Sequence, residues 1–214
     1  MVDNGAAEAT KVIVHPDGSQ TTEANTEHTS LDFEEIVYWA TWIGADEIIL
    51  PDKKLSAEET LARCADSKII TSIPPVKRAI VPQGKDVNEW KWCYKHLDMG
   101  LRGNYATVCI TKDYELFPGG REALATWLRS LPVPYRHIHY LGIKDNPRDE
   151  IQRAIYSGGV RSLDSGIAMA YAQHDKLLSE WLGHESMLWN APYDERLLDR
   201  NMSLLDDWSN PDAH

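Results

Sequence analysis

Residues 77–84 read K-R-A-I-V-P-Q-G, a short apolar run that ends in a proline, a glutamine and a glycine. Directly after it, Val87, Trp90, Tyr94 and Leu97 recur at the spacing of one helical face. A buried strand followed by an amphipathic helix is the unit from which parallel sheets are built. This stretch therefore predicts an α/β fold.

The same unit recurs on both sides of this stretch. Five short apolar runs are predicted as strands, at residues 46–50, 77–82, 106–111, 136–141 and 160–163. Amphipathic stretches lie between them, and the strand centres are 32, 28, 30 and 25 residues apart. A nearly constant step of this size is typical of repeated β/α units with parallel strands.

We expect a (β/α)8 TIM-barrel-like fold that lacks the first two β/α units. Met1 and Val2 are predicted to end a sixth strand, whereas a closed barrel needs eight. Either two units are missing from the gene product or the true start lies upstream. A doubly wound open sheet is the alternative, although no Gly-rich dinucleotide turn follows any predicted strand.

Two segments depart from the β/α pattern. Residues 11–29 are polar and show no periodicity, which indicates a loop. Residues 173–214 are acidic and contain Trp, with helical spacing around Leu178 and again around Leu198. The predicted division is a β/α barrel over residues 1–172 and an acidic helical C-terminal segment over residues 173–214.

Composition excludes several classes of protein. No stretch approaches the roughly 18 apolar residues of a membrane span, and residues 1–10 lack the layout of a signal peptide. Three cysteines without paired spacing fit a reducing cytoplasm and argue against a disulfide framework or a Cys-rich zinc site. The net charge of −11 argues against a generic nucleic-acid coat. Any polynucleotide contact therefore needs a local patch, for which Lys53 and Lys54 are the best candidates.

At least four of the predicted strands end in a polar side chain beside a Gly or a Pro. The strand ends are Asp3-Asn4-Gly5, Pro51-Asp52, Pro82-Gln83-Gly84, Thr111-Lys112, Leu141-Gly142 and Asp164-Ser165-Gly166. The carboxyl ends of parallel strands carry the chemistry of β/α folds, and crowded carboxylates acquire different pKa values. Each position alone is also an ordinary turn or helix cap, but the set predicts an active site at this end of the sheet. His139 is interpreted as a satisfied interior histidine rather than a metal ligand.

In their order and spacing these motifs resemble the tRNA-guanine transglycosylase (queuine/archaeosine tRNA-ribosyltransferase) superfamily. The resemblance is to its short, divergent members, often carried by phages that modify DNA with 7-deazaguanines. It covers about residues 1–172. The motifs are V-D-N-G-A (residues 2–6), I-I-L-P-D (48–52), V-P-Q-G (81–84), H-Y-L-G-I (139–143) and V-R-S-L-D-S (160–165).

The resemblance implies a base exchange in which guanine in tRNA or DNA is replaced by a 7-deazaguanine, as in queuosine formation. Asp164 would be the nucleophile that attacks C1′ and forms a covalent glycosyl-enzyme. Asp3 would move the proton between the departing and the arriving base.

The resemblance also implies which residues bind the base. Asp52 would accept the N–H groups of the purine's amidine-like edge, and Gln83 with the Gly84 N–H would read its carbonyl edge. Leu141 and Gly142 would line the base pocket. Expected partners are nucleic acid and a free 7-deazaguanine base, with a homodimer or pairing with a fuller transglycosylase subunit left open. The expected location is the cytoplasm, that of the host if the gene belongs to a phage.

The sequence departs from the family pattern in several places. Asn4 replaces a small hydroxyl residue, and residues 109–112 replace a Gly-rich strand end. The family's Cys-x-Cys-x-x-Cys…His zinc module is absent from the sequence, so no cofactor is expected and tRNA is less favoured as the substrate.

Two other functions stay open. One is a non-catalytic transglycosylase-like subunit, which the short start favours and the retention of both Asp3 and Asp164 disfavours. The other is an unrelated β/α-barrel lyase or hydrolase acting on a small metabolite, in which Asp52, Asp164 and His139 would ligate a divalent metal.

Overall fold

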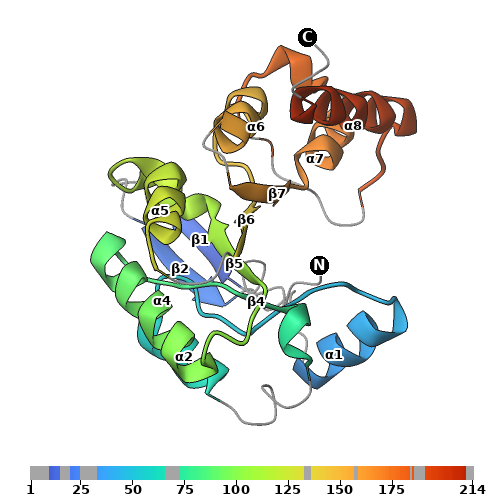
Figure 1. Ribbon diagram of the computed structural model, residues 1–214. Helices are drawn as coiled ribbons and strands as arrows, with labels where there is room; N and C mark the ends of the chain where they lie inside the picture. The colour runs from blue at the N-terminus through green and yellow to red at the C-terminus, as the bar shows by residue number, and fades with distance from the viewer. Residues whose placement is uncertain are drawn as a thin grey trace. The chain divides into compact units, whose positions relative to one another are not determined.

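The structure is a computed structural model that describes residues 10–14, 20–24, 33–65, 73–132, 136–156, 159–183, 185 and 191–210 (Figure 1). The chain divides into two compact units, Met1–Val108 and Cys109–His214, and each is described by itself. Within the described ranges, no helix is long and apolar enough to cross a membrane. Met1 and Val2, which the sequence predicts as the end of a strand, lie outside those ranges.

Parallel strands alternate with helices, which confirms the predicted α/β class. In sheet order the strands are β3 (Ile48–Ile49), β4 (Arg78–Ile80), β5 (Thr107–Thr111), β6 (His137–Leu141) and β7 (Val160–Asp164). β3 and β4 are shorter than predicted. Each is soon followed by a proline, Pro51 or Pro82, which has no N–H to donate to a ladder. Because the described residues hold five parallel strands, the closed barrel stays a proposal.

The first unit also contains an antiparallel hairpin where the sequence predicts a loop. β1 (Thr10–Val14) pairs with β2 (Gln20–Ala24) in one regular register. The prediction of a loop over residues 11–29 is therefore wrong for both strands. Most of their residues are Val, Ile or Thr, which favour strands, and the intervening P-D-G is a turn signal that outweighs the polar composition.

The two helices of the first unit that follow β3 and β4 lie in the amphipathic stretches predicted between the strands. The described helices of this unit are α1 (Phe33–Trp42), α2 (Ala57–Cys64) and α4 (Val87–Leu101), with the 3-10 turn η1 (Pro75–Lys77) before β4. α2 and α4 pack against each other (Figure 1). The predicted apolar face of α4, with Trp90, Tyr94 and Leu97, is buried. This packing places a helix beside the ends of both β3 and β4.

The connection from β4 to α4 is fixed by a glycine and a helix cap. A Cβ atom on Gly84 would lie 2.4 Å from the backbone nitrogen of Trp90, so only glycine lets the strand end approach the helix this closely. Asp86 caps the helix by accepting hydrogen bonds from the N–H groups of Asn88 (2.7 Å) and Glu89 (2.9 Å). The backbone around Gln83 is thereby held against the start of α4.

The second unit is built around β6 and β7. Its other elements are η2 (Lys112–Leu116), α5 (Gly120–Arg129), α6 (Pro147–Tyr156), α7 (Ile167–Gln173), η3 (Leu178–Glu180) and α8 (Glu195–Ser209). β6 and β7 are parallel, with His139 opposite Ser162 and Leu141 opposite Asp164. α6 and α7 both pack against α8 (Figure 1). The register brings the end of β6 level with the end of β7.

The C-terminal segment folds onto the second unit. The helix predicted around Leu198 is α8, whose apolar residues pack against buried Ile167, Tyr171 and Leu178. Asn201 is fully buried and accepts a hydrogen bond from the Leu178 N–H at 2.8 Å. The helix predicted around Leu178 is wrong in type, because the chain forms only the short 3-10 turn η3 there. The domain boundary between residues 172 and 173 stays a prediction.

Candidate functional site

The predicted site residues fall into two clusters, one in each unit. Asp52, Gln83 and Gly84 follow the ends of β3 and β4 in the first unit. Leu141, Gly142 and Asp164 stand at the ends of β6 and β7 in the second. Asp3 lies outside the described residues, so its predicted role stays a prediction.

In the first cluster, Gln83 holds Asp52 directly. Nε2 of Gln83 donates to Oδ2 of Asp52 at 2.6 Å, and Oε1 of Gln83 accepts the backbone N–H of Leu55 at 3.0 Å. Since a backbone N–H can only donate, the amide must turn its oxygen to Leu55 and its nitrogen to Asp52. Both side chains are buried, with exposed fractions of 7% for Asp52 and 2% for Gln83. The structure thus joins two residues that the sequence assigns to the same base.

Helix α2 holds the loop that carries Asp52. Arg63 donates to the carbonyl oxygen of Asp52 at 2.7 Å, and the Cys64 thiol donates to that of Pro51 at 3.2 Å. The Lys53 N–H donates to Oγ1 of Thr60 at 2.9 Å. These bonds fix the backbone on both sides of Asp52.

Two buried thiols lie beneath this cluster. Burial raises the pKa of Cys64 to about 12, and the nearby charge of Asp52 adds to the shift. Burial also raises the pKa of Cys93 to about 11, against a lowering by the Gln83 N–H, which donates to its sulfur at 3.4 Å. Both thiols are therefore uncharged at neutral pH and add no negative charge next to Asp52.

In the second cluster, Gly142 holds Asp164. Its backbone N–H donates to Oδ1 of Asp164 at 2.8 Å, across the register that pairs Leu141 with Asp164. Gly142 has a φ of 72°, and a Cβ atom on it would lie 3.0 Å from Cδ of Lys112. The left-handed backbone favours glycine here, and a larger residue would also have to displace the Lys112 side chain.

His139 joins this cluster, whereas the sequence groups it with Asp164 only in the metal-dependent alternative and gives it no part in the base exchange. Its Nδ1 lies 2.7 Å from Oγ of Ser162, and its Nε2 lies 3.5 Å from Oδ2 of Asp164. The ring is buried, as predicted, while the Asp164 side chain is 54% exposed. The signal in the sequence is alternation, because Ser162 and Asp164 stand two residues apart on β7 and so face the same side of the sheet as His139.

These neighbours keep Asp164 ionised. Burial raises the pKa of its carboxyl, but the contact with His139, the Gly142 N–H and the charge of Arg121 together outweigh burial and hold the pKa below its ordinary value. At neutral pH Asp164 is therefore a half-exposed carboxylate. A group of this kind can act as a nucleophile or stabilise a developing positive charge.

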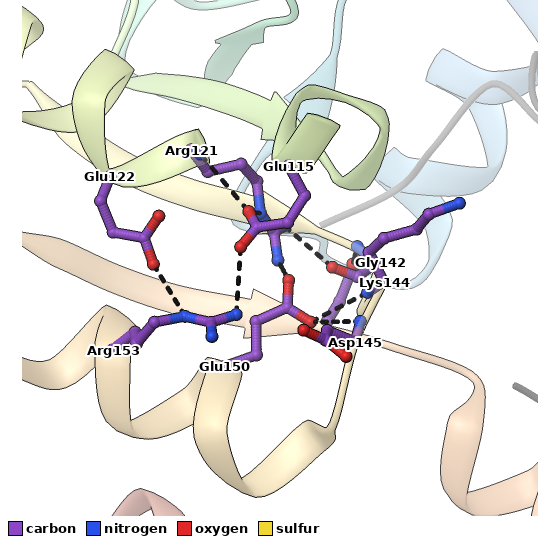
Figure 2. Close-up of polar contacts among 9 residues, drawn as sticks. Glu115, Arg121, Glu122, Gly142, Lys144, Asp145, Glu150 and Arg153 are labelled. Atoms are coloured by element: carbon purple, nitrogen blue, oxygen red, sulfur yellow. Dashed lines mark hydrogen bonds and ion pairs between the residues drawn. The ribbon is translucent and has the colours of Figure 1, made fainter. Parts of the chain in front are cut away.

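A buried ion network supports the loop that carries Gly142 (Figure 2). Arg121 on α5 is fully buried and donates through Nη1 to the carbonyl oxygen of Gly142 at 2.9 Å. Its guanidinium also forms ion pairs with Glu150 and, at 3.4 Å, with Glu115, and lies 4.3 Å from the centre of the Tyr140 ring. Arg121 on α5 thus connects η2 and α6 to the end of β6.

Glu150 completes the support from α6 (Figure 2). Its Oε2 accepts the backbone N–H groups of Lys144 at 2.9 Å and Asp145 at 3.2 Å. Arg153 on the same helix pairs with Glu115 and Glu122, each at 3.0 Å. Residues 142–145 are consequently held by charged side chains on two helices, which fixes the N–H that Gly142 directs at Asp164.

The described part of the chain offers no donor set for a metal ion. Nowhere in it do three His, Cys, Asp or Glu side chains gather at metal-binding distance. The metal-dependent alternative therefore gains no support from these residues.

Comparisons with known proteins identify no relative of this chain. No protein-family model matches the chain, and no curated protein matches its sequence. A proposal of function therefore starts from the two side-chain clusters and from the motifs that carry them.

Proposed function

We propose that the chain is a base-exchange glycosyltransferase of the tRNA-guanine transglycosylase type, which replaces guanine in tRNA or DNA with a 7-deazaguanine. The observation that carries the proposal is the hydrogen bond from the Gly142 N–H to Asp164. It joins an ionised carboxylate to the residue expected to line the base pocket, at the carboxyl ends of two paired strands.

In the proposed first half-reaction, a carboxylate oxygen of Asp164 attacks C1′ of a guanosine. The bond from C1′ to Asp164 forms as the bond from C1′ to N9 breaks, and guanine leaves with the electron pair of that bond. Asp3 gives the departing base one proton. The product is a covalent glycosyl-enzyme.

In the proposed second half-reaction, N9 of the incoming 7-deazaguanine attacks the same carbon. Asp3 takes the N9 proton as the new bond forms, and Asp164 leaves as a carboxylate. Both residues return to their starting protonation states, and nothing is oxidised or reduced. The exchange needs no cofactor.

The first cluster supplies a base-binding role in this proposal. A buried carboxylate can accept two N–H donors of a guanine-like edge, and Gln83 keeps Asp52 oriented before the base arrives. The Gly84 N–H would read the carbonyl edge, while Leu141 and Gly142 would line the base pocket. A (β/α)8-like barrel belongs to the same proposal, as do a nucleic-acid partner and a cytoplasmic location.

The test is exchange of labelled guanine into tRNA and into double-stranded DNA, measured side by side. We expect wild type to exchange into one of the two polymers and Asp164→Asn to lose exchange by about a thousandfold or more. Asp149→Asn, which changes an exposed aspartate on α6 in the same unit, is the matched control and should retain exchange. Exchange into neither polymer would favour the non-catalytic subunit.

A further inference from the structure

Asp164 is flanked by a histidine to which the proposed mechanism gives no role. Nε2 of His139 lies 3.5 Å from Oδ2 of Asp164, while the Gly142 N–H donates to Oδ1. Each carboxylate oxygen therefore faces one nitrogen. The two nitrogens come from the same strand end, three residues apart on β6 and the turn after it.

Ser162 bears on which nitrogen of His139 carries the ring proton. Its hydroxyl lies 2.7 Å from Nδ1. When the hydroxyl donates to Nδ1 of a neutral ring, the ring proton is on Nε2, the nitrogen that faces Asp164. In a protonated ring both nitrogens carry protons and the Ser162 oxygen accepts one. In both of these states His139 presents an N–H to Asp164. A neutral ring with its proton on Nδ1 would instead direct the lone pair of Nε2 at the carboxylate, which is repulsive.

We propose that His139, oriented by Ser162, is a positioning residue that fixes the carboxylate of Asp164 for attack on the sugar carbon. This inference rests on the proposed base exchange and adds the group that orients its nucleophile. A carboxylate held at one oxygen alone still rotates about its Cβ–Cγ bond, whereas contacts at both oxygens define its plane. Displacements of about 1 Å at a reacting group can cost about a hundredfold in rate, so this restraint bears directly on turnover.

Other charged groups act on the same carboxylate. Arg121 on α5 lowers the pKa of Asp164 by its charge, and the side chain of Lys112 in η2 lies against Gly142. Variants of His139 and Ser162 leave both cations in place. A change seen in those variants therefore belongs to the histidine and its serine.

Three variants separate the parts of this arrangement. His139→Phe keeps a planar ring but removes the N–H, and His139→Gln keeps an amide N–H at similar reach without the imidazole ring. Ser162→Ala leaves the ring but removes its partner at Nδ1. His96→Gln is the control, because His96 is a half-buried histidine on α4 in the other unit, where its ring contacts Trp92.

The first measurement is independent of activity: a ¹³C NMR titration of the Asp164 carboxyl, assigned with Asp164→Asn. We expect His139→Phe to raise the Asp164 pKa, since a contact that lowers it is lost, and His139→Gln to raise it less. The Asp164 pKa in Ser162→Ala should fall between its values in the two His139 variants, and its value in His96→Gln should match wild type. An unchanged Asp164 pKa in both His139 variants would overturn the inference.

The second measurement is the exchange assay. We expect His139→Phe to lower kcat about tenfold or more while the KM for the free base changes less than about twofold, and His139→Gln to recover part of kcat. If wild type exchanges and neither His139 variant is slower, the positioning role is wrong and the base exchange stands. If the pKa shifts appear but wild type exchanges nothing, the contact is real and the base exchange is wrong.

Discussion

Gln83 donates its side-chain amide to Asp52 across 2.6 Å, although the two residues are 31 positions apart in the chain. The loop after β3 fixes the amide through Leu55, and α2 fixes the backbone of Asp52 through Arg63. Both partners are buried. The carboxylate is therefore oriented before any ligand binds, which would lower the entropic cost of recognising the proposed base.

Asp52→Asn should weaken binding of the free base and leave the fold intact. An asparagine oxygen can still accept from Gln83, but the charge that would accept two N–H donors is gone. Loss of a charge-assisted hydrogen bond costs about 1.5–3 kcal/mol, so the KM or Kd for guanine should rise about tenfold to a hundredfold. Titration calorimetry with guanine measures this Kd. Asp46→Asn, an exposed aspartate before β3, is the control, and equal affinities in the two variants would contradict the role of Asp52.

Arg121→Met should strongly destabilise the protein. It leaves Glu150, which is 1% exposed, without its arginine, and it removes the donor to the Gly142 carbonyl. Breaking a buried pair on one side costs about 3–5 kcal/mol. Urea unfolding measures the loss, and Arg148→Met at an exposed position of α6 should cost less than about 0.5 kcal/mol. Similar midpoints for the two variants would show that the network contributes little.

Gly142→Ala should cost more than the same change at Gly44. Gly44 has a φ of 68° and open space around its Cβ position, so alanine there carries only the backbone strain of about 1–2 kcal/mol. Gly142 has a similar φ of 72°, but its new methyl group also meets Lys112 at 3.0 Å. We expect a larger drop in the free energy of unfolding and about a tenfold loss of exchange, because the N–H directed at Asp164 moves. Equal effects of the two substitutions on exchange would refute this.

The buried thiol of Cys64 predicts a loss of stability at alkaline pH. Burial raises its pKa to about 12, whereas an unfolded thiol titrates near 8.5. The folded value is the higher one, so the contribution is complete below about pH 8.5 and is lost as the pH rises towards 12. At pH 10 the loss is about 2 kcal/mol. Cys64→Ala should therefore lose less stability than wild type between about pH 8 and pH 10 in urea unfolding, and parallel curves would contradict it.

The strand and helix positions could be predicted because each follows from local periodicity. The face of α4 repeats every three to four residues, and the apolar runs of β5, β6 and β7 stand alone between helices. The hairpin of β1 and β2 was not predictable by the same rule, since its strands are mixed polar and apolar. β-branched residues and a turn signal favour this pairing, but the polar composition of the segment as a whole does not reveal them.

The candidate site could be predicted only in part. The strand-end rule finds Asp52, Gln83, Gly142 and Asp164, because such residues interrupt the apolar pattern. It does not find Arg121, since a basic residue in the first turn of a helix looks like a solvated one. Its burial depends on three acceptors from other segments, Glu115, Gly142 and Glu150. These acceptors lie apart in the sequence and come together only when the chain folds.

The most direct test of the central claim is the intact mass of the protein after incubation with guanosine-containing tRNA or DNA. If Asp164 is the nucleophile, wild type that is denatured during the reaction carries the added mass of a covalently linked nucleic acid. Free guanine added before denaturation should remove this adduct. Asp164→Asn carries no such adduct, and Asp149→Asn carries it as wild type does. An adduct of the same mass on Asp164→Asn would contradict the assignment.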